Sequence, residues 1–186
     1  MRRRSLLLLV PLLVAAGFAL AGRGPAPADL PPGPPPTKAA RPNKRIGDAG
    51  AVRVVDGDTL RIGEVRIRLH GIDAPEQAQS CADASGRRYG CGQAAAAALT
   101  RLIGGNRPDC VERDRDRYGR SVAICSVAGR DLNRAMVAEG WAVAYTQYSR
   151  DYVGEETAAR RARRGVWQGS FERPAEYRAE RRGRRG

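Results

Sequence analysis

The residues that carry chemistry are concentrated in the stretch 53–76, which reads RVVDGDTLRIGEVRIRLHGIDAPE. The stretch contains an acidic turn, Asp56-Gly57-Asp58-Thr59, then an arginine on a strand, Arg68, and it ends in the cluster Asp73-Ala74-Pro75-Glu76. Carboxylates and an arginine this close together in sequence indicate a site for a metal ion and a phosphate group. A plain β-hairpin with an Asp-Gly turn and solvated surface charges is the alternative that this spacing leaves open.

The alternation of apolar and basic residues in this stretch predicts which way Arg68 points. Positions 65, 67 and 69 are apolar, whereas positions 66, 68 and 70 are basic. Because side chains alternate between the two faces of a strand, Arg68 is predicted on the accessible face, opposite the core. Strict alternation sends Asp73 to the other face. The two side chains can therefore meet only if the strand bends or ends near Gly71.

Hydrophobic periodicity and turn residues outline the other elements. They predict strands at 50–55, 59–62 and 65–72, a helix at 92–103, a hairpin at 108–127, a helix at 132–139 capped by Asp131, an extended segment at 141–145 and a helix at 155–164. This order of elements predicts an α+β fold, namely a five-stranded β-barrel of the OB-fold type with about three helices.

The four cysteines are predicted to form two disulfides. If the turn of the hairpin centres on Arg117-Tyr118, Cys110 lies directly opposite Cys125. Opposed residues have Cβ atoms about 4.5–5.5 Å apart, a separation from which a cross-strand disulfide can form. Cys81 and Cys91 then remain as the second pair. The cysteines lack Cys-x-x-Cys spacing and the chain has one histidine, so a structural zinc site is disfavoured.

Arg120 follows the turn of the same hairpin. It falls in phase with Val122 and Ile124, so it is predicted to point the way that these apolar residues do. An inward-facing arginine needs a negative partner, because an unpaired buried cation is very costly. Either a carboxylate of the protein or a phosphate of a substrate could fill that role.

The two ends of the chain differ from its middle in composition. Residues 1–21 have three arginines followed by an uncharged apolar run and small residues at Ala19 and Ala21, which predicts a secretory signal peptide. An uncleaved membrane anchor, tethering the protein, is the alternative. Residues 22–47 are rich in proline and are predicted to be a flexible linker, residues 48–170 the folded domain, and residues 171–186 a disordered, arginine-rich tail.

The chain is strongly basic. Its formal net charge is +13, and residues 1–21 contribute only three of these positive charges. Such an excess favours a polyanionic partner, either nucleic acid or an anionic membrane surface, although it could also serve solubility alone.

Three separated motifs together resemble the staphylococcal nuclease (thermonuclease) family over roughly residues 50–168. The motifs are Val55-Asp56-Gly57-Asp58-Thr59, then Ile67-Arg68-Leu69 running into Ile72-Asp73-Ala74-Pro75-Glu76, and Asp116-Arg117-Tyr118-Gly119-Arg120. The resemblance implies an OB-fold nuclease domain and a Ca²⁺-dependent phosphodiesterase that cuts DNA and RNA to leave 3′-phosphates. The predicted protein is a monomer that prefers single strands and has no obligate protein partner. Its signal peptide and disulfides predict export to the periplasm or outside the cell.

The resemblance also implies a role for each matching residue. Asp58 and Asp73 would supply carboxylates to Ca²⁺ and Ala74 its backbone carbonyl, Arg68 and Arg120 would hold the phosphate, Glu76 would act as general base, and Arg117, Tyr118 and Tyr145 would contact substrate. Two guanidiniums and a cation directed at a phosphoryl group provide the electrostatic stabilisation that phosphodiester hydrolysis needs.

The sequence departs from the family pattern at two positions. Ala74 stands where the well-known member has threonine, and Gln147 replaces one of two substrate-contacting tyrosines, for which Tyr148 is a candidate substitute. Two other functions compete with hydrolysis. One is a catalytically inactive nucleic-acid-binding module of the OB type, and the other is an envelope protein that binds anionic lipid through its two ends.

Overall fold

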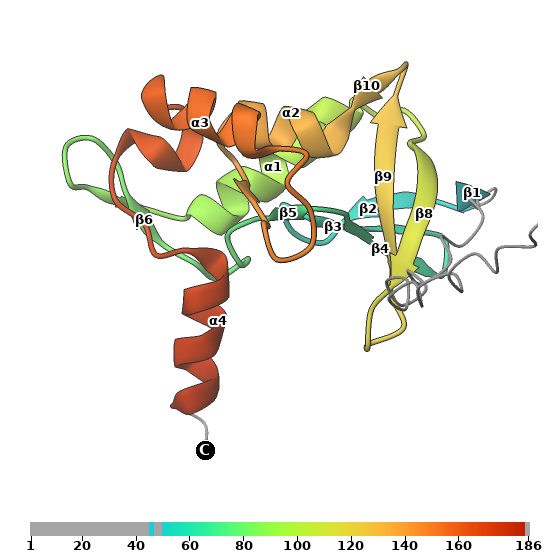
Figure 1. Ribbon diagram of the computed structural model, residues 1–186, viewed down its shortest axis with the longest axis horizontal. Coiled ribbons are helices and arrows are strands. Elements are labelled where there is room, and N and C mark those ends of the chain that lie inside the picture. Colours follow the sequence, from blue (N-terminus) through green and yellow to red (C-terminus); the bar gives the residue numbers. More distant parts are fainter. Residues whose placement is uncertain (1–44, 47–49, 185–186) are drawn as a thin grey trace, which may run out of the picture. The chain divides into compact units, whose positions relative to one another are not determined.

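The computed structural model describes residues 45–46 and 50–184 (Figure 1). The predicted signal peptide and almost all of the predicted linker lie outside the described residues, so both stay predictions. Within the part of the chain that is described, no helix is both long and apolar enough to cross a membrane.

In the described residues, short strands make up the first part of the chain and most of the helices lie in its second part. The strands are β1 (Arg45–Ile46), β2 (Val52–Val54), β3 (Thr59–Ile62), β4 (Val65–Leu69), β5 (Ile72–Asp73), β6 (Cys81–Ala82), β7 (Arg88–Tyr89), β8 (Asp109–Arg115), β9 (Ser121–Val127), β10 (Arg130–Asp131) and β11 (Val143–Ala144). The helices are α1 (Cys91–Ile103), α2 (Leu132–Ala138), α3 (Val153–Arg161), the 3-10 helix η1 (Gly165–Gln168) and α4 (Pro174–Gly183).

One sheet of seven strands forms the centre of the fold. Its order is β1-β8-β9-β4-β3-β2, with β10 pairing to β9, and β4 runs parallel to β9 while the other neighbours are antiparallel. The predicted α+β class is confirmed. The prediction of a five-stranded barrel with about three helices needs correction, because this sheet is not a closed barrel and the described residues contain four α-helices. Its end strands, β1 and β2, contain only two and three residues.

The strand β4 lies inside the sheet, between β3 and β9. Its apolar residues Ile67 and Leu69 are buried and Arg68 is partly exposed, as the alternation predicted. The strand ends earlier than predicted, at Leu69, because Gly71 has a φ of 73°, a left-handed conformation that glycine adopts without strain. The chain then enters β5, whose Asp73 pairs with Val143 of β11.

The hairpin β8–β9 has the predicted register over its first half. Cys110 lies opposite Cys125, and the two form a disulfide with Cα atoms 4.1 Å apart. A β-bulge between Glu112 and Asp114 then shifts the register by one residue before the turn. Cys81 and Cys91 form the second disulfide, so both predicted pairings are confirmed.

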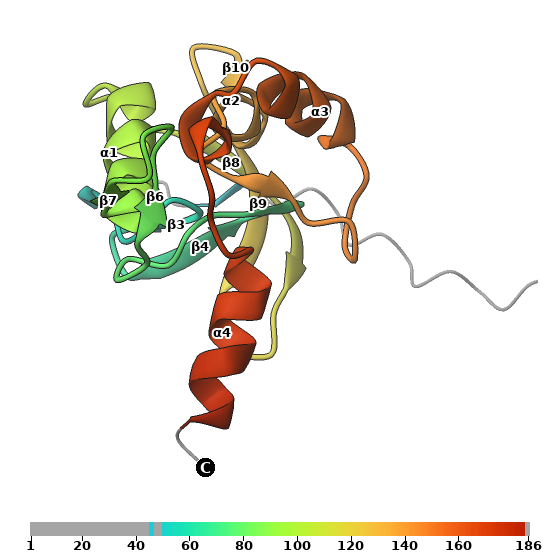
Figure 2. The same cartoon turned by 90° about the vertical axis from the view of Figure 1, so that its left-hand side faces the viewer.

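The helices α1, α2 and α3 lie together on one side of the sheet, whereas α4 projects on the other side in both views (Figures 1 and 2). Asp131 caps α2 as predicted, since its carboxylate accepts a hydrogen bond from the backbone amide of Arg134. The apolar faces of these helices and of the sheet share one core, which contains Leu60, Ile67 and Leu99.

The predicted disorder of the C-terminal tail is wrong, because α4 occupies most of it. Pro174 stands in the first turn of α4, where its fixed φ suits a helix and its missing amide proton costs nothing. Alanine, glutamate and arginine, which favour helices, make up most of the remainder. Pro174 is the only residue of α4 that is buried.

Candidate active site

The acidic turn before β3 places Asp58 in a buried position. Its carboxylate accepts hydrogen bonds from the Thr59 hydroxyl at 3.1 Å and from the Ala74 backbone amide at 3.0 Å. The second contact ties the turn to the segment that follows β5. Asp58 is only 4% exposed, so its carboxylate is held by the fold rather than by solvent.

Arg68 brings the two predicted metal-binding carboxylates together. Its Nη2 atom donates to Asp58 Oδ2 at 3.0 Å and to Asp73 Oδ1 at 2.7 Å. The predicted meeting of Arg68 and Asp73 therefore occurs, and it depends on the end of β4 before Gly71. Burial opposes the charge on the guanidinium, but Asp58 and Asp73 together raise the pKa of Arg68 above its ordinary value.

The carboxylates of the site are crowded in a poorly solvated region. Burial raises the pKa of Asp73, and the nearby Asp58 adds to this effect, while hydrogen bonds from Arg178 and the charge of Arg68 act against it. Burial, followed by repulsion from Asp58, raises the pKa of Asp56 to about 7. Such shifts are typical of sites where several acidic groups share little solvent.

Glu76 lies on a segment whose backbone is tightly held. Its amide donates to Gln79 Oε1 at 3.2 Å, and its carbonyl oxygen accepts from the Gln79 amide at 2.7 Å. A Cβ atom at Gly92, in the first turn of α1, would lie 1.8 Å from the same carbonyl oxygen, so only glycine fits there. The Glu76 side chain is 35% exposed, which leaves its carboxylate accessible to water.

Arg120 lies at the tip of the β8–β9 hairpin, and its predicted inward orientation is wrong. The core side of β9 carries Ser121, Ala123 and Cys125, whereas the half-exposed Val122 marks the side that Arg120 shares. Of the two predicted partners, a protein carboxylate or a substrate phosphate, the structure shows the carboxylate: Arg120 Nε donates to Asp116 Oδ2 at 2.6 Å. Burial opposes ionisation of Asp116, but the bonds from Arg120 keep the pKa of Asp116 below its ordinary value.

The structure places most of the predicted site residues around two adjoining cavities. A pocket of about 310 Å³ is lined by Asp58, Arg68, Ala74, Glu76, Tyr118 and Arg120, among others. A cleft of about 470 Å³ continues from it and is lined by both arginines together with Arg117, Tyr118, Tyr145 and Tyr148. Asp73 borders neither cavity but contacts Arg68.

Three tyrosines border the cleft. The rings of Tyr145 and Tyr148 meet edge to face with centroids 4.8 Å apart. Tyr118 and Tyr148 are each 70% exposed, so their rings are accessible from outside the protein. Arg117 donates from Nη2 to the Tyr118 hydroxyl at 2.8 Å, so the predicted substrate-contacting pair is already in mutual contact.

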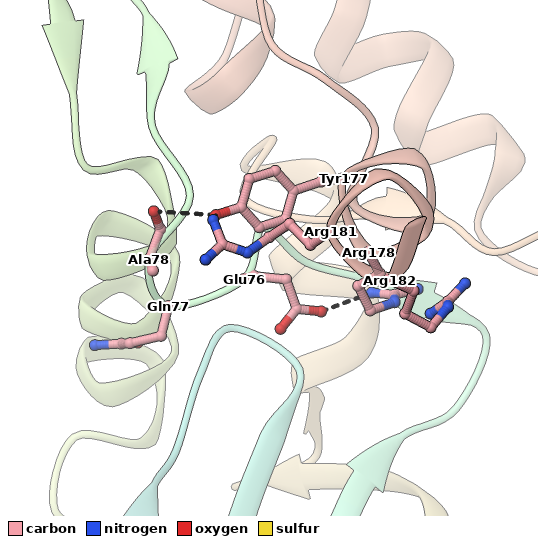
Figure 3. A pocket seen from close by; sticks show the side chains of 7 residues that line it. All are labelled: Glu76, Gln77, Ala78, Tyr177, Arg178, Arg181 and Arg182. Atoms are coloured by element: carbon pink, nitrogen blue, oxygen red, sulfur yellow. Dashed lines mark hydrogen bonds and ion pairs between the residues drawn. The ribbon is translucent and has the colours of Figure 1, made fainter. Parts of the chain in front are cut away.

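Sequence reasoning missed one member of this site, Arg178 of α4. Its Nη1 atom donates to Asp73 Oδ1 and to Glu76 Oε1, each at 2.9 Å, and its Nη2 atom donates to Asp73 Oδ2 at 3.0 Å. Figure 3 shows Arg178 reaching from the helix to Glu76. Burial opposes the charge of the guanidinium, but Asp73 and Glu76 raise the pKa of Arg178 well above its ordinary value. Pro174 and the helix-forming residues after it were the signal that could have revealed α4.

The donor groups of the site fit a hard divalent cation. Asp58 and Asp73 offer carboxylate oxygens, the ligands that Ca²⁺ prefers, and both converge on a single cationic nitrogen of Arg68. Across the described residues, no three or more His, Cys, Asp or Glu side chains are arranged to hold a metal ion. Two carboxylates therefore need backbone oxygen and water to complete the ligand set.

Comparisons with known proteins agree with this geometry. Residues 66–169 match the family model described as staphylococcal nuclease homologue. The chain is 38% identical over 121 residues to the succinoglycan biosynthesis protein ExoI of Rhizobium meliloti (strain 1021), covering 63% of each protein. It is 35% identical over 123 residues to an uncharacterized endonuclease of Escherichia coli O157:H7, covering 62% of this chain and 74% of that protein.

A third relative is the micrococcal nuclease of Shigella flexneri. The two chains are 32% identical over 133 residues, which cover 62% of this chain and 71% of that protein.

Proposed function

Because this chain belongs to the family of staphylococcal nuclease homologues, we propose that it is a nuclease that hydrolyses phosphodiester bonds. The family membership inferred from the three motifs is confirmed. The observation that best supports the activity is the pocket in which Arg68, Arg120 and Glu76 meet next to Asp58.

The two arginines of the pocket would bind and stabilise the phosphoryl group. Attack on a phosphodiester increases the negative charge on its non-bridging oxygens, and preorganised guanidiniums stabilise that charge. Arg68 reaches the pocket from β4 and Arg120 from the hairpin tip, so their separation is set by the pairing of β4 with β9. Arginine remains protonated and can contact two phosphate oxygens at once.

Glu76 would serve as the general base. Its carboxylate lies in the same pocket and is partly exposed, so it can receive a proton from an attacking water molecule. Its tightly held backbone fixes the place from which the side chain extends.

The metal of this nuclease is proposed to be Ca²⁺. Nucleases of this family generally depend on a divalent metal. The carboxylates of Asp58 and Asp73 and the backbone carbonyl of Ala74 would hold it. When bound, such a cation stabilises negative charge on the phosphoryl oxygens.

The substrate is proposed to be DNA and RNA, cleaved to 3′-phosphate products, with single strands preferred. The exposed tyrosines along the cleft support this, because aromatic rings stack on unpaired bases of any sequence. The protein is further proposed to act as an exported monomer, in the periplasm or outside the cell. Its two disulfides suit an oxidising compartment.

The activity is tested by incubating the full-length protein with denatured DNA and millimolar Ca²⁺, with and without a chelator. Cleavage that the chelator abolishes is expected. Absence of cleavage together with tight DNA binding would instead favour the alternative, a catalytically inactive nucleic-acid-binding module.

The role of Glu76 is tested by Glu76→Gln. The substitution keeps the size of the side chain but removes its basicity, so turnover should fall by about 10²–10⁴-fold while DNA affinity changes little. Glu64→Gln is the matched control, because the Glu64 side chain is 98% exposed and lies between β3 and β4, outside the pocket. A Glu76→Gln protein with near-normal turnover would rule out the general-base role.

A further inference from the structure

Arg178 contacts both of the acidic groups that the proposed reaction needs most. It binds both carboxylate oxygens of Asp73, the proposed metal ligand, and one oxygen of Glu76, the proposed base. The three contacts join residues 102 and 105 positions apart in sequence. A cation from the C-terminal helix thus neutralises the place where a metal ion and a reacting water would act.

The guanidinium and a metal ion compete for the same oxygens. Asp73 Oδ1 already accepts from Arg68 at 2.7 Å and from Arg178 at 2.9 Å, while Oδ2 accepts from Arg178 at 3.0 Å. An ionised carboxylate has about four lone-pair positions, so these bonds use most of its capacity. Two cations held by one carboxylate also repel each other. Withdrawal of Arg178 therefore favours metal binding at Asp73.

The attachment of α4 is suited to release. Pro174, at its start, is the only buried residue of the helix. Beyond the ion pairs, Tyr177 donates from its hydroxyl to the Ala78 carbonyl at a long 3.4 Å (Figure 3). Arg181 and Arg182, on the next turn, are exposed. A segment held by polar contacts with little apolar burial can open without unfolding the rest of the domain.

We propose that α4 is an autoinhibitory latch: Arg178 occupies Asp73 and Glu76 in the metal-free protein, and a divalent cation at Asp73 displaces it. This inference rests on the proposed metal-dependent function. Binding of the cation and docking of α4 are then linked reciprocally, so each weakens the other by the same factor.

The latch is tested by titrating Ca²⁺ calorimetrically into three full-length proteins: wild type, Arg178→Gln and Arg182→Gln. Removing the competing guanidinium should lower the Kd for Ca²⁺ by roughly tenfold, within the range usual for such linkage. Arg182→Gln is the matched control, because it removes the same charge from an exposed position of the same helix. Its Kd should change by less than about twofold, since exposed charges are well screened.

Hydrogen exchange of the α4 amides supplies a second measurement. In wild type, Ca²⁺ should accelerate exchange in residues 175–182, whereas in Arg178→Gln these amides should exchange fast with or without Ca²⁺. A lower Kd without any change in exchange would mean that Arg178 acts by charge alone, and would overturn the latch. Equal Kd values with unchanged exchange would overturn it too while leaving the Ca²⁺ site intact. If none of the three proteins binds Ca²⁺, the proposed calcium chemistry fails and the latch with it.

Discussion

The strand β4 and the helix α4 each direct one arginine at Asp73, yet the two elements are held in opposite ways. β4 lies between β3 and β9, with Arg68 paired to Thr59 on one side and to Val122 on the other. α4 forms no strand pairing and buries only its first residue. The two arginines contact Asp73 at similar distances, but these contacts need not be equally long-lived. Whether an arginine can leave Asp73 depends on how firmly its strand or helix is packed.

The largest effect should come from removing Arg68. Arg68→Gln leaves the buried Asp58 without its ion pair and Asp73 with Arg178 alone, so the free energy of unfolding should fall by about 3 kcal/mol. Arg178→Gln should cost about 1 kcal/mol or less, because Asp73 keeps Arg68 and the helix is held weakly. Urea unfolding measures both changes, with the exposed Arg66→Gln on the same strand as a control. Equal losses for the two arginines would remove the distinction between β4 and α4.

Loss of either disulfide should have an effect of about the same size. Cys110–Cys125 and Cys81–Cys91 close segments with sequence separations of 15 and 10, so replacing either pair by alanine should cost about 3 kcal/mol on the loop-entropy model.

The two disulfide variants should differ in where hydrogen exchange increases. Loss of Cys110–Cys125, in the core of the sheet, should raise exchange across β8 and β9. Loss of Cys81–Cys91 should raise it chiefly in η1 and the segment leading to α4, because that disulfide packs against Val166 and its strand bridges Ser170. If both variants showed the same pattern of exchange, the two disulfides would not stabilise separate regions, and the prediction would be wrong.

The smallest effect concerns His70, which directly follows β4. Burial lowers the pKa of its imidazole below the ordinary value of 6.5, and its Nδ1 atom is buried without a hydrogen-bond partner in the described structure. The unfolded chain therefore binds a proton more readily, so His70 should make the protein less stable as pH falls below 6.5.

As the sole histidine, His70 can be titrated without ambiguity by NMR. We expect a pKa below 6.5. A pKa of His70 at or above 6.5 would indicate that the end of β4 is exposed to solvent, although the backbone amide of His70 donates a hydrogen bond to the Ala123 carbonyl.

The sequence was most informative where neighbours along the chain decide the structure. Alternation predicted the burial pattern of β4, and the hairpin geometry predicted the pairing of Cys110 with Cys125. The sequence correctly placed Arg120 on the same side of the hairpin as Val122 and Ile124, but it assigned that side to the core. The small residues Ser121 and Ala123, rather than these larger apolar ones, are buried on the core side of β9. Size alone therefore misled the assignment of inside and outside.

Contacts between distant segments could not be predicted. The pairing of β5 with β11 and the ion pairs of Arg178 join segments about 70 and 105 residues apart. The arginine-rich composition of the C-terminal segment resembles a solvated tail, so the polar contacts that dock α4 left no hydrophobic signal. The three motifs thus predicted the residues of the candidate site except Arg178, which lies outside all three motifs.

The β-bulge in β8 has a consequence for length variation in this protein. The register shifts by one residue between Glu112 and Asp114, and the shift sets the face of the sheet on which the last residues of β8 lie. Deleting one residue there would restore a regular ladder and turn Asp114 and Arg115, which lead into the hairpin tip, toward the opposite face of the sheet. Asp116, next along the chain, would then lose its contact with Arg120, whose own position is set by the pairing of β9 with β4. Homologues that have gained or lost one residue at this point can therefore keep all three motifs and still hold Arg120 without its carboxylate partner.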